Sequence, residues 1–436
     1  MSLRAQSIAR EEIQEMTENK KIKVLTLSDH PLAPSGVGIQ TRLFIQSLLD
    51  TGNYEFVSLA GAHKHEDYTP MKTENYGDDW RIYPVDGYGT AEVVRSIVRT
   101  EKPDVMWLMT DPRYWSWLWQ IEDEIRPLVP MVYYHVWDNF PAPKFNEKYY
   151  RSNDVVVAAS KLTEDILQEV VPDLNTPRIA HTVDEDSFKV LDAEEVQKFR
   201  EEHVGDTDKV LFFWNNRNTK RKHPTTLLWW FKEFVEEVGR ENVALLLHTD
   251  PKEPVGCDIE HNLKELGLDR GEVMISPLKY SEDKMAMLYN MSDCTINISD
   301  AEGFGLSTLE SLFCGTPIIV SNTGGLQEQV TDGTESFGVG IDPSSRTLLG
   351  SQIVPYIYED HISKEDFLDA MRTIYNMTKE ERRNLGMKGQ KYVKENYSLE
   401  SYGQQWNQLI SDVYNNHGSW DTRNYKNWQL IEVNNG

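Results

Sequence analysis

The sequence predicts an α/β protein with two doubly wound domains facing each other across a cleft. Three observations predict this fold. The chain has 436 residues, whereas single hydrophobic cores stop growing at about 250–300 residues. Short apolar runs alternate with segments able to form helices, which is typical of a parallel sheet covered on both faces. This alternation occurs twice along the chain. Because doubly wound sheets bind ligands at the carboxyl ends of their strands, the ligand is expected in the cleft.

The first series of expected strands begins at residues 22–28 (IKVLTLS), followed by a Pro/Gly-rich loop and a helical pattern. Its further strands are YEFVSLA, DVMWLM, PMVYYHV and DVVVAAS. The second series contains KVLFFWN, the amphipathic helix TTLLWWFKEFVEEVG, and then VALLLHT, EVMIS, CTINIS and TPIIVS. A polar, acidic segment separates the two series, so the expected domains are residues 1–195 and 196–395. Residues 396–436 are expected to form a helix and a polar tail.

Composition excludes several classes of protein. Lysine and arginine number 45 against 70 aspartates and glutamates, a formal charge of -25. Such a charge argues against broad nucleic-acid or anionic-membrane binding. Three scattered cysteines fit a reducing compartment and neither a disulfide scaffold nor a zinc site. The start of the chain is polar and no apolar run approaches 18 residues, so we expect no signal peptide, no transmembrane segment and a cytoplasmic location.

The most informative segment follows the strand CTINIS. A loop with Glu302, Gly303 and Gly305 leads into a helix beginning near Leu306. The glycines allow close approach of a ligand, and the amides of residues 304–306 (Phe304, Gly305 and Leu306) would form an anion site at the helix N-terminus.

Two glutamates, Glu302 and Glu310, lie eight residues apart in this segment. Both can face the same cleft, and a carboxylate accepts well from vicinal hydroxyls of a sugar or a ribose. Taken singly, each is also explained as an ordinary residue near a helix N-terminus or on its solvated face. A second glycine pair, Gly324–Gly325, followed by Glu328, repeats the strand–loop–helix transition and favours the functional interpretation.

The motif Glu-x7-Glu within EGFGLSTLE, continued by CGTPIIVSNTGGLQE, resembles the donor-site signature of family-4 glycosyltransferases (glycosyl transferases group 1). The resemblance covers roughly residues 20–415. It implies the GT-B fold of two Rossmann-like domains, a C-terminal helix crossing back onto the first domain, and transfer with retained anomeric configuration. It also implies a nucleotide-sugar co-substrate such as a UDP- or GDP-hexose, with no cofactor and no metal. The resemblance further implies that Glu310 holds the ribose diol and that Glu302 holds the sugar hydroxyls.

Other positions are assigned by the same resemblance. Arg217 and Lys222, five residues apart after KVLFFWN, would grip the donor diphosphate, and His223 stands where the family has a glycine. Gly36 and Gly38, in SGVG, resemble the family's N-terminal glycine loop. His135, at the end of PMVYYHV, resembles the cleft histidine that contacts the donor sugar. A lone histidine after an apolar strand is otherwise more often structural.

Ser160 matches a strand–helix junction of the family and is expected first to cap a helix and only second to bind a ligand. The crowded aromatics of residues 107–119 cannot all face one way on a helix, so some are expected at the surface or the cleft. The close acidic pairs Asp78–Asp79 and Asp184-x-Asp186 lie in surface-like acidic contexts and predict no metal site.

The function predicted is hexosyl transfer from a nucleotide sugar to a hydroxyl acceptor, which the sequence does not identify beyond a glycan or small molecule. Residues 1–190 hold 20 Lys/Arg and 30 Asp/Glu, which argues against duplex DNA as a partner. The alternatives are an epimerase or phosphorylase on the same fold, a viral-type glucosyltransferase of hydroxymethylated DNA bases, and a non-catalytic nucleotide-sugar-binding protein.

Overall fold

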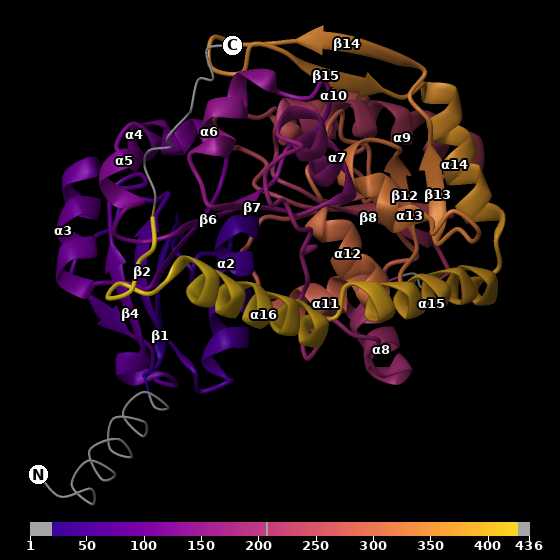
Figure 1. The fold of residues 1–436 in the computed structure, drawn as a ribbon. Helices are drawn as coiled ribbons and strands as arrows, with labels where there is room; N and C mark the ends of the chain where they lie inside the picture. Colours follow the sequence, from indigo (N-terminus) through magenta and orange to yellow (C-terminus); the bar gives the residue numbers. More distant parts are fainter. Residues whose placement is uncertain (1–19, 206–207, 426–436) are drawn as a thin grey trace, which may run out of the picture. The chain divides into compact units, whose positions relative to one another are not determined.

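The computed structural model describes residues 20–205 and 208–425 (Figure 1). Its contacts divide the chain into two compact units. Unit 1 contains the described residues up to His135, with Asn146–Val157 and those from Tyr402 on, and unit 2 contains Val136–Phe145 and Ala158–Ser401. Residues 158–195, assigned to the first domain by the sequence pattern, therefore lie in unit 2. The reason is packing, since Val183 and Phe188 are buried in the core of that unit.

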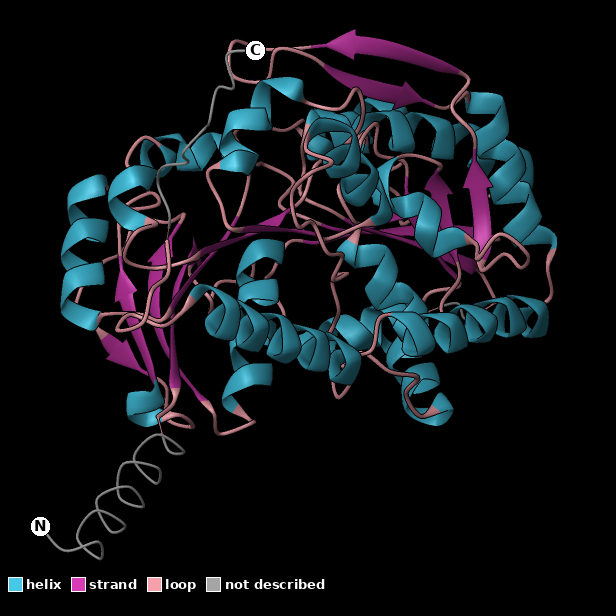
Figure 2. Cartoon of the chain, in the orientation of Figure 1, coloured by secondary structure: helices cyan, strands magenta, loops and turns pink. Residues whose placement is uncertain are grey.

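Unit 1 is built on a seven-stranded sheet (Figure 2). Strand β1 pairs in parallel with β2 and β5, while β3 is antiparallel to β4. In sheet order the strands are β3 (Met71–Lys72), β4 (Trp80–Pro84), β2 (Tyr54–Gly61), β1 (Ile22–Asp29), β5 (Val105–Met109), β6 (Met131–His135) and β7 (Val155–Ala158). The helices of this part of the chain are α2 (Gly36–Leu49), α3 (Ala91–Glu101), α4 (Ser116–Trp119), α5 (Glu122–Ile125), α6 (Glu147–Arg151) and α16 (Leu399–His417).

Large aromatic side chains form much of the core of unit 1. Phe44 of α2 stacks on Trp107 of β5 with ring centroids 4.4 Å apart. Trp406 of α16 contacts both rings and also Tyr134 of β6. The part of α16 from Tyr402 on is therefore held to unit 1 by aromatic packing, which contributes more than its buried area alone.

The aromatic run after β5 divides between core and surface. Trp115 is completely buried and Trp119 nearly so, whereas Tyr114 is 46% exposed. Tyr114 lies against the ring of Tyr88, with centroids 4.8 Å apart. The sequence prediction that these aromatics cannot all face the core is confirmed.

Unit 2 contains a six-stranded sheet and a two-stranded ribbon. The sheet order is β10 (Val273–Ser276), β9 (Val243–His248), β8 (Val210–Asn215), β11 (Cys294–Asn297), β12 (Ile318–Ser321) and β13 (Gly338–Ile341), and the ribbon pairs β14 (Ser345–Leu349) with β15 (Ile357–His361). The helices are α7 (Lys161–Val170), α8 (Ala193–Val204), α9 (Pro224–Val238), α10 (Ile259–Leu266), α11 (Glu282–Met291), α12 (Leu306–Phe313), α13 (Gln327–Val330), α14 (Lys364–Asn376) and α15 (Lys379–Asn396).

Alternate residues of β8 enter two different hydrophobic cores. Phe212 and Trp214 pack with residues of α9, α10 and α14. Leu211 and Phe213 pack with residues of α11 and α12. Because successive side chains of a strand point to opposite faces, the sheet is covered by helices on both sides. This arrangement confirms the doubly wound α/β fold predicted from near-continuous apolar strands.

No helix in the described part of the chain is both long enough and apolar enough to cross a membrane.

Candidate functional site

The loop after β11 carries the expected donor signature into helix α12. Gly305 has φ +95° and directly precedes Leu306, the first residue of α12, without a side-chain cap. Gly324 has φ +52°, and a Cβ there would collide with the carbonyl oxygen of Glu302. The amide of Gly325 donates to that same oxygen over 2.9 Å. The two glycine motifs therefore pack against each other, and only glycine suits both conformations.

Glu302 lies among three charged groups of unit 2. Its carboxylate forms an ion pair with the buried Lys222. Arg221 lies 3.7 Å from Glu302 and 3.8 Å from Asp138, and it donates to the carbonyl oxygen of Ala301 over 2.5 Å. The structure thus joins the basic loop after β8 to the acidic loop after β11, although the two are about 80 positions apart in sequence.

Burial governs the electrostatics of this group. Burial lowers the pKa of Lys222 well below its ordinary value, Arg221 lowers it further, and Asp138 raises it. The contact with Glu302 acts against this shift, because an adjacent carboxylate stabilises an ammonium. An ammonium with so little solvation interacts strongly with an anionic ligand, so an anion bound next to Lys222 favours its charged form.

Arg217 takes part in a different ion pair. Its side chain is 68% exposed and pairs with Glu253 over 2.7 Å. The predicted grip of Arg217 and Lys222 on one diphosphate stays a prediction. Arg221, which lies next to Glu302, was not assigned from the sequence, although the run Lys220-Arg221-Lys222 gave a signal for it.

Glu310 ends a chain of hydrogen bonds inside unit 2. Asn215, the last residue of β8, donates its amide to the hydroxyl of Tyr289 over 2.7 Å, and this hydroxyl donates to Glu310 Oε2 over 2.6 Å. Burial raises the pKa of Glu310 to about 7, the Tyr289 hydrogen bond opposes the shift, and Glu282 adds to it. Tyr289 and Asn215 carried no sequence signal of their own, because their relation to Glu310 exists only in the folded sheet.

His135 is completely buried within unit 1. Its Nδ1 lies 3.1 Å from the hydroxyl of Tyr133, and its Nε2 lies 2.9 Å from the hydroxyl of Tyr150. Burial lowers the pKa of His135 to about 3, so the ring is neutral at pH 7. These contacts fit the structural interpretation of this histidine. Its predicted contact with a donor sugar stays a prediction.

The glycine loop of unit 1 begins helix α2. Ser35 caps the helix by accepting from the amide of Gly38 over 3.0 Å, and its hydroxyl donates to Asp29 over 2.6 Å. Gly36 is exposed, whereas a Cβ on Gly38 would lie 2.7 Å from the carbonyl oxygen of Ala33. Gly38 is therefore needed for the tight turn itself, and binding roles for both glycines stay predictions.

Ser160 caps helix α7 by accepting from the amide of Thr163, as expected. The neighbouring aspartates Asp78 and Asp79 each form an ion pair with a lysine. Asp78 pairs with Lys72, and Asp79 pairs with Lys21.

Residues 195–392 match the family described as glycosyl transferases group 1. The chain is 25% identical to the N-acetyl-alpha-D-glucosaminyl L-malate synthase of Bacillus anthracis over 232 residues, which cover 53% of this chain and 57% of that protein. It is 22% identical to an alpha-1,3/1,6-mannosyltransferase of Dictyostelium discoideum over 301 residues, 63% of this chain and 64% of that one. The matched segments thus span less than two thirds of these relatives.

Two solved structures have the same fold over nearly the whole chain. Sucrose-phosphate synthase of Thermosynechococcus elongatus superposes with a TM-score of 0.72 at 16% identity, covering 91% of this chain and 100% of that one. The Anabaena protein HepE, solved with UDP-glucose, gives 0.67 at 15% identity, covering 90% and 100%. The donor signature and the family match agree: residues 195–392 match the glycosyl transferases group 1 family, and the chain has the GT-B fold.

Proposed function

We propose that the chain is a retaining glycosyltransferase that moves a hexose from a UDP- or GDP-activated donor to a hydroxyl acceptor. The observation that carries this proposal is the contact of Lys222 and Arg221 with Glu302, directly before the N-terminus of α12. A nucleotide sugar needs cations for its diphosphate and a carboxylate for its sugar hydroxyls, and unit 2 brings these groups together.

In the proposed complex the donor diphosphate lies against Lys222 and the first amides of α12. Helix N-termini and ammonium groups both stabilise the charge that develops on a departing diphosphate. Glu302 then exchanges its contact with Lys222 for hydroxyl groups of the sugar, which orients the anomeric carbon and favours its developing positive charge. Glu310 accepts from the ribose diol, held in position by Tyr289.

The proposed reaction uses no covalent carboxylate nucleophile. The acceptor hydroxyl attacks the anomeric carbon on the face from which the diphosphate departs, and the leaving phosphate oxygen takes the acceptor proton. This order breaks one glycosidic bond to phosphate, forms one to the acceptor and retains configuration. Since Lys222, Arg221 and the amides supply positive charge at the diphosphate, we propose that transfer needs no divalent metal and no cofactor.

The proposed acceptor is a saccharide or another small hydroxyl compound. The Bacillus relative is named as a glucosaminyl L-malate synthase and the Dictyostelium relative as a mannosyltransferase. These names support a small hydroxyl compound or a glycan as the class of acceptor and identify no particular compound. Duplex DNA requires a basic surface along its phosphates, and residues 1–190 carry 20 Lys/Arg against 30 Asp/Glu. Labelling of hydroxymethylated duplex DNA with donor sugar would overturn this choice.

The test is a panel of UDP and GDP sugars measured in two ways. A bound donor raises the melting temperature, because it binds only the folded state. The same donor should release its nucleoside diphosphate slowly in water, and faster with an accepted hydroxyl compound. Release should be much slower in Glu302→Gln and unchanged in Glu380→Gln, a glutamate in the first turn of α15. Donor binding without release in any acceptor mixture would instead favour a non-catalytic binding protein.

A further inference from the structure

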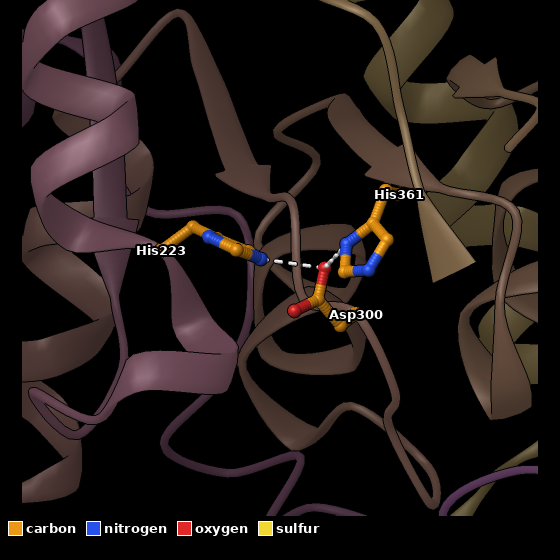
Figure 3. A group of neighbouring side chains, drawn as sticks. All are labelled: His223, Asp300 and His361. Atoms are coloured by element: carbon orange, nitrogen blue, oxygen red, sulfur yellow. Dashed lines mark hydrogen bonds and ion pairs between the residues drawn. The ribbon is translucent and has the colours of Figure 1, made fainter. Parts of the chain in front are cut away.

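Two histidines and one aspartate of unit 2 converge on a single point (Figure 3). His223 Nε2 lies 2.5 Å from Asp300 Oδ1, and His361 Nδ1 lies 2.9 Å from the same oxygen. The three ligand atoms all lie within 4.8 Å of one another. Figure 3 shows the two imidazole rings approaching the carboxylate from opposite sides.

Each ligand comes from a different element. His223 lies at the N-terminus of α9, Asp300 follows β11, and His361 ends β15 of the ribbon. The sequence separates them by 77 and 61 positions, which is why no spacing motif predicted the group. His223 has φ +55° and ψ +40°, a left-handed conformation that favours glycine. A histidine occupies this left-handed position, and its ring contacts Asp300.

The remaining ring nitrogens are also occupied. His361 Nε2 lies 2.9 Å from the hydroxyl of Thr347, and His223 Nδ1 lies 3.5 Å from the hydroxyl of Thr226. Such outer partners hold the tautomer and orientation of histidines that bind metals. Asp300 is held through its backbone, since its amide donates to the carbonyl oxygen of Arg221 and its own carbonyl oxygen accepts from the amide of Asp360.

Solvent access and charge also suit a cation. Asp300 is almost fully buried, whereas the side chains of His223 and His361 are 27% and 31% exposed, which leaves a path for an ion. The Asp300 carboxylate supplies an oxygen ligand between the two rings. Metal–nitrogen and metal–oxygen bonds are about 2.0–2.2 Å long, which places tetrahedral ligand atoms roughly 3.3–3.6 Å apart. The contacts of both histidines with Asp300 would therefore have to widen to admit an ion.

We propose that His223, Asp300 and His361 bind a divalent transition-metal ion, with Zn²⁺ the ion whose ligands they match. Two imidazoles and one carboxylate suit zinc, and three protein ligands leave one position open. Mg²⁺ and Ca²⁺ prefer oxygen ligands and match this set poorly. The site is independent of the proposed transfer chemistry, because none of its three ligands is assigned to the donor.

The ion would join three segments that surround the donor loop. His223 is adjacent to Lys222, Asp300 is two residues before Glu302, and His361 belongs to the β14–β15 ribbon. A metal linking them restrains the loop after β8 against the loop after β11. Its role is therefore stabilisation of unit 2.

The test uses the full chain without a histidine tag and requires no activity. Zn²⁺ is titrated in competition with a chelating indicator, and Co²⁺ is titrated while its visible absorption is recorded. We expect one saturable site per chain, a tetrahedral Co²⁺ spectrum, and a melting temperature that rises with Zn²⁺. His361→Gln and His223→Gly should each weaken binding at least tenfold. His261→Gln is the matched control, because that histidine is 67% exposed on α10, and its binding should equal wild type.

Two results would overturn the proposal. One is the absence of saturable Zn²⁺ or Co²⁺ binding by the wild-type chain at about 100 μM ion. The other is equal binding by wild type, His361→Gln and His261→Gln, which would place the ion elsewhere. Circular dichroism of each variant establishes folding, and the wild-type Co²⁺ spectrum decides between the outcomes even where a variant does not fold.

Discussion

The hydroxyl of Tyr289 donates a 2.6 Å hydrogen bond to the carboxylate of Glu310. Tyr289 is completely buried and receives a second hydrogen bond from Asn215. The contact orients a glutamate whose pKa is raised to about 7 by burial. Tyr289 thereby links Glu310, which is proposed to hold the ribose, to the end of β8. Nucleotide binding and the stability of unit 2 should therefore both depend on the Tyr289 side chain.

Glu310→Gln should stabilise the protein in alkaline solution. The ordinary pKa of 4.5 applies to the unfolded chain, whereas the folded pKa is about 7. The folded state thus holds a proton that the unfolded state has released. The stability from this group is fully present below about pH 4.5 and is lost as pH rises through 7. Glutamine is neutral at every pH and avoids this loss.

The measurement is the melting temperature of both proteins from pH 5.5 to 8.5. The gain at pH 8.5 should be on the order of 1–3 kcal/mol and should shrink toward pH 5.5. Glu265→Gln, at an exposed position of α10, serves as control and should show no such trend. A gain independent of pH, or a loss of stability at pH 8.5, would contradict the raised pKa.

Glu302→Gln and Glu310→Gln should impair catalysis differently. Glu302 is proposed to act mainly in the transition state, so its variant should lower kcat with a modest change in donor affinity. Glu310 is proposed to touch only the nucleotide, so its variant should mainly raise the donor KM. Steady-state kinetics with varied donor separates the two cases. Identical defects in kcat and KM would refute this division.

Donor affinity should also depend on pH through Glu310. A carboxylate accepts from both ribose hydroxyls, whereas its protonated form loses part of this capacity. The donor KM of the wild type should therefore rise as pH falls below about 7, the pKa to which burial raises Glu310. Glu310→Gln should lack this inflection. A wild-type profile identical to that of the variant would show that Glu310 does not hold the donor.

Lys222→Ala should reduce transfer far more than Lys220→Ala. Lys222 is buried against Glu302, whereas Lys220 is exposed in the same turn. One charge-assisted contact contributes roughly 1.5–3 kcal/mol, or about 10–150-fold in rate. Arg221→Ala should fall in the same range. Arg217→Ala should cause a similar loss if Arg217 binds the diphosphate, as its spacing from Lys222 predicts. Arg217 would then have to give up its ion pair with Glu253.

The comparison uses kcat/KM with saturating acceptor, and melting curves establish that each variant folds. Because the cations share one site, their losses should not add in the double variant Arg221→Ala/Lys222→Ala. Equal activity of Lys220→Ala and Lys222→Ala would show that Lys222 does not bind the diphosphate.

Transfer should survive EDTA in buffers without magnesium or manganese. Fixed cations and helix amides are proposed to neutralise the diphosphate, so a hard divalent ion has no step to serve. Loss of transfer that Mg²⁺ or Mn²⁺ restores would make this diphosphate assignment wrong. Loss that only Zn²⁺ restores, and that His361→Gln reproduces, would instead show that the ion at His223, Asp300 and His361 orders the donor loop.

The sequence by itself determined the α/β class and the two doubly wound sheets. Strands buried on both faces must be apolar along their whole length, as in VLFFWN and VALLLH, and this pattern is local. The donor signature was equally readable, because Gly305 and Gly324 adopt backbone conformations that glycine tolerates at no steric cost. Glu302, Glu310 and Lys222 could also be named from the sequence, because each lies in a short segment that resembles a family motif.

Only the tertiary structure decided which of these groups meet. Arg221 rather than Arg217 lies beside Glu302, because the turn after β8 directs neighbouring side chains to different places. Burial of His135 between two tyrosine hydroxyls depends on residues that the sheet and α6 bring together. The convergence of His223 and His361 on Asp300 likewise joins three distant segments. Such contacts are set by the packing of parallel strands and their crossover connections, whose long-range register no local pattern encodes.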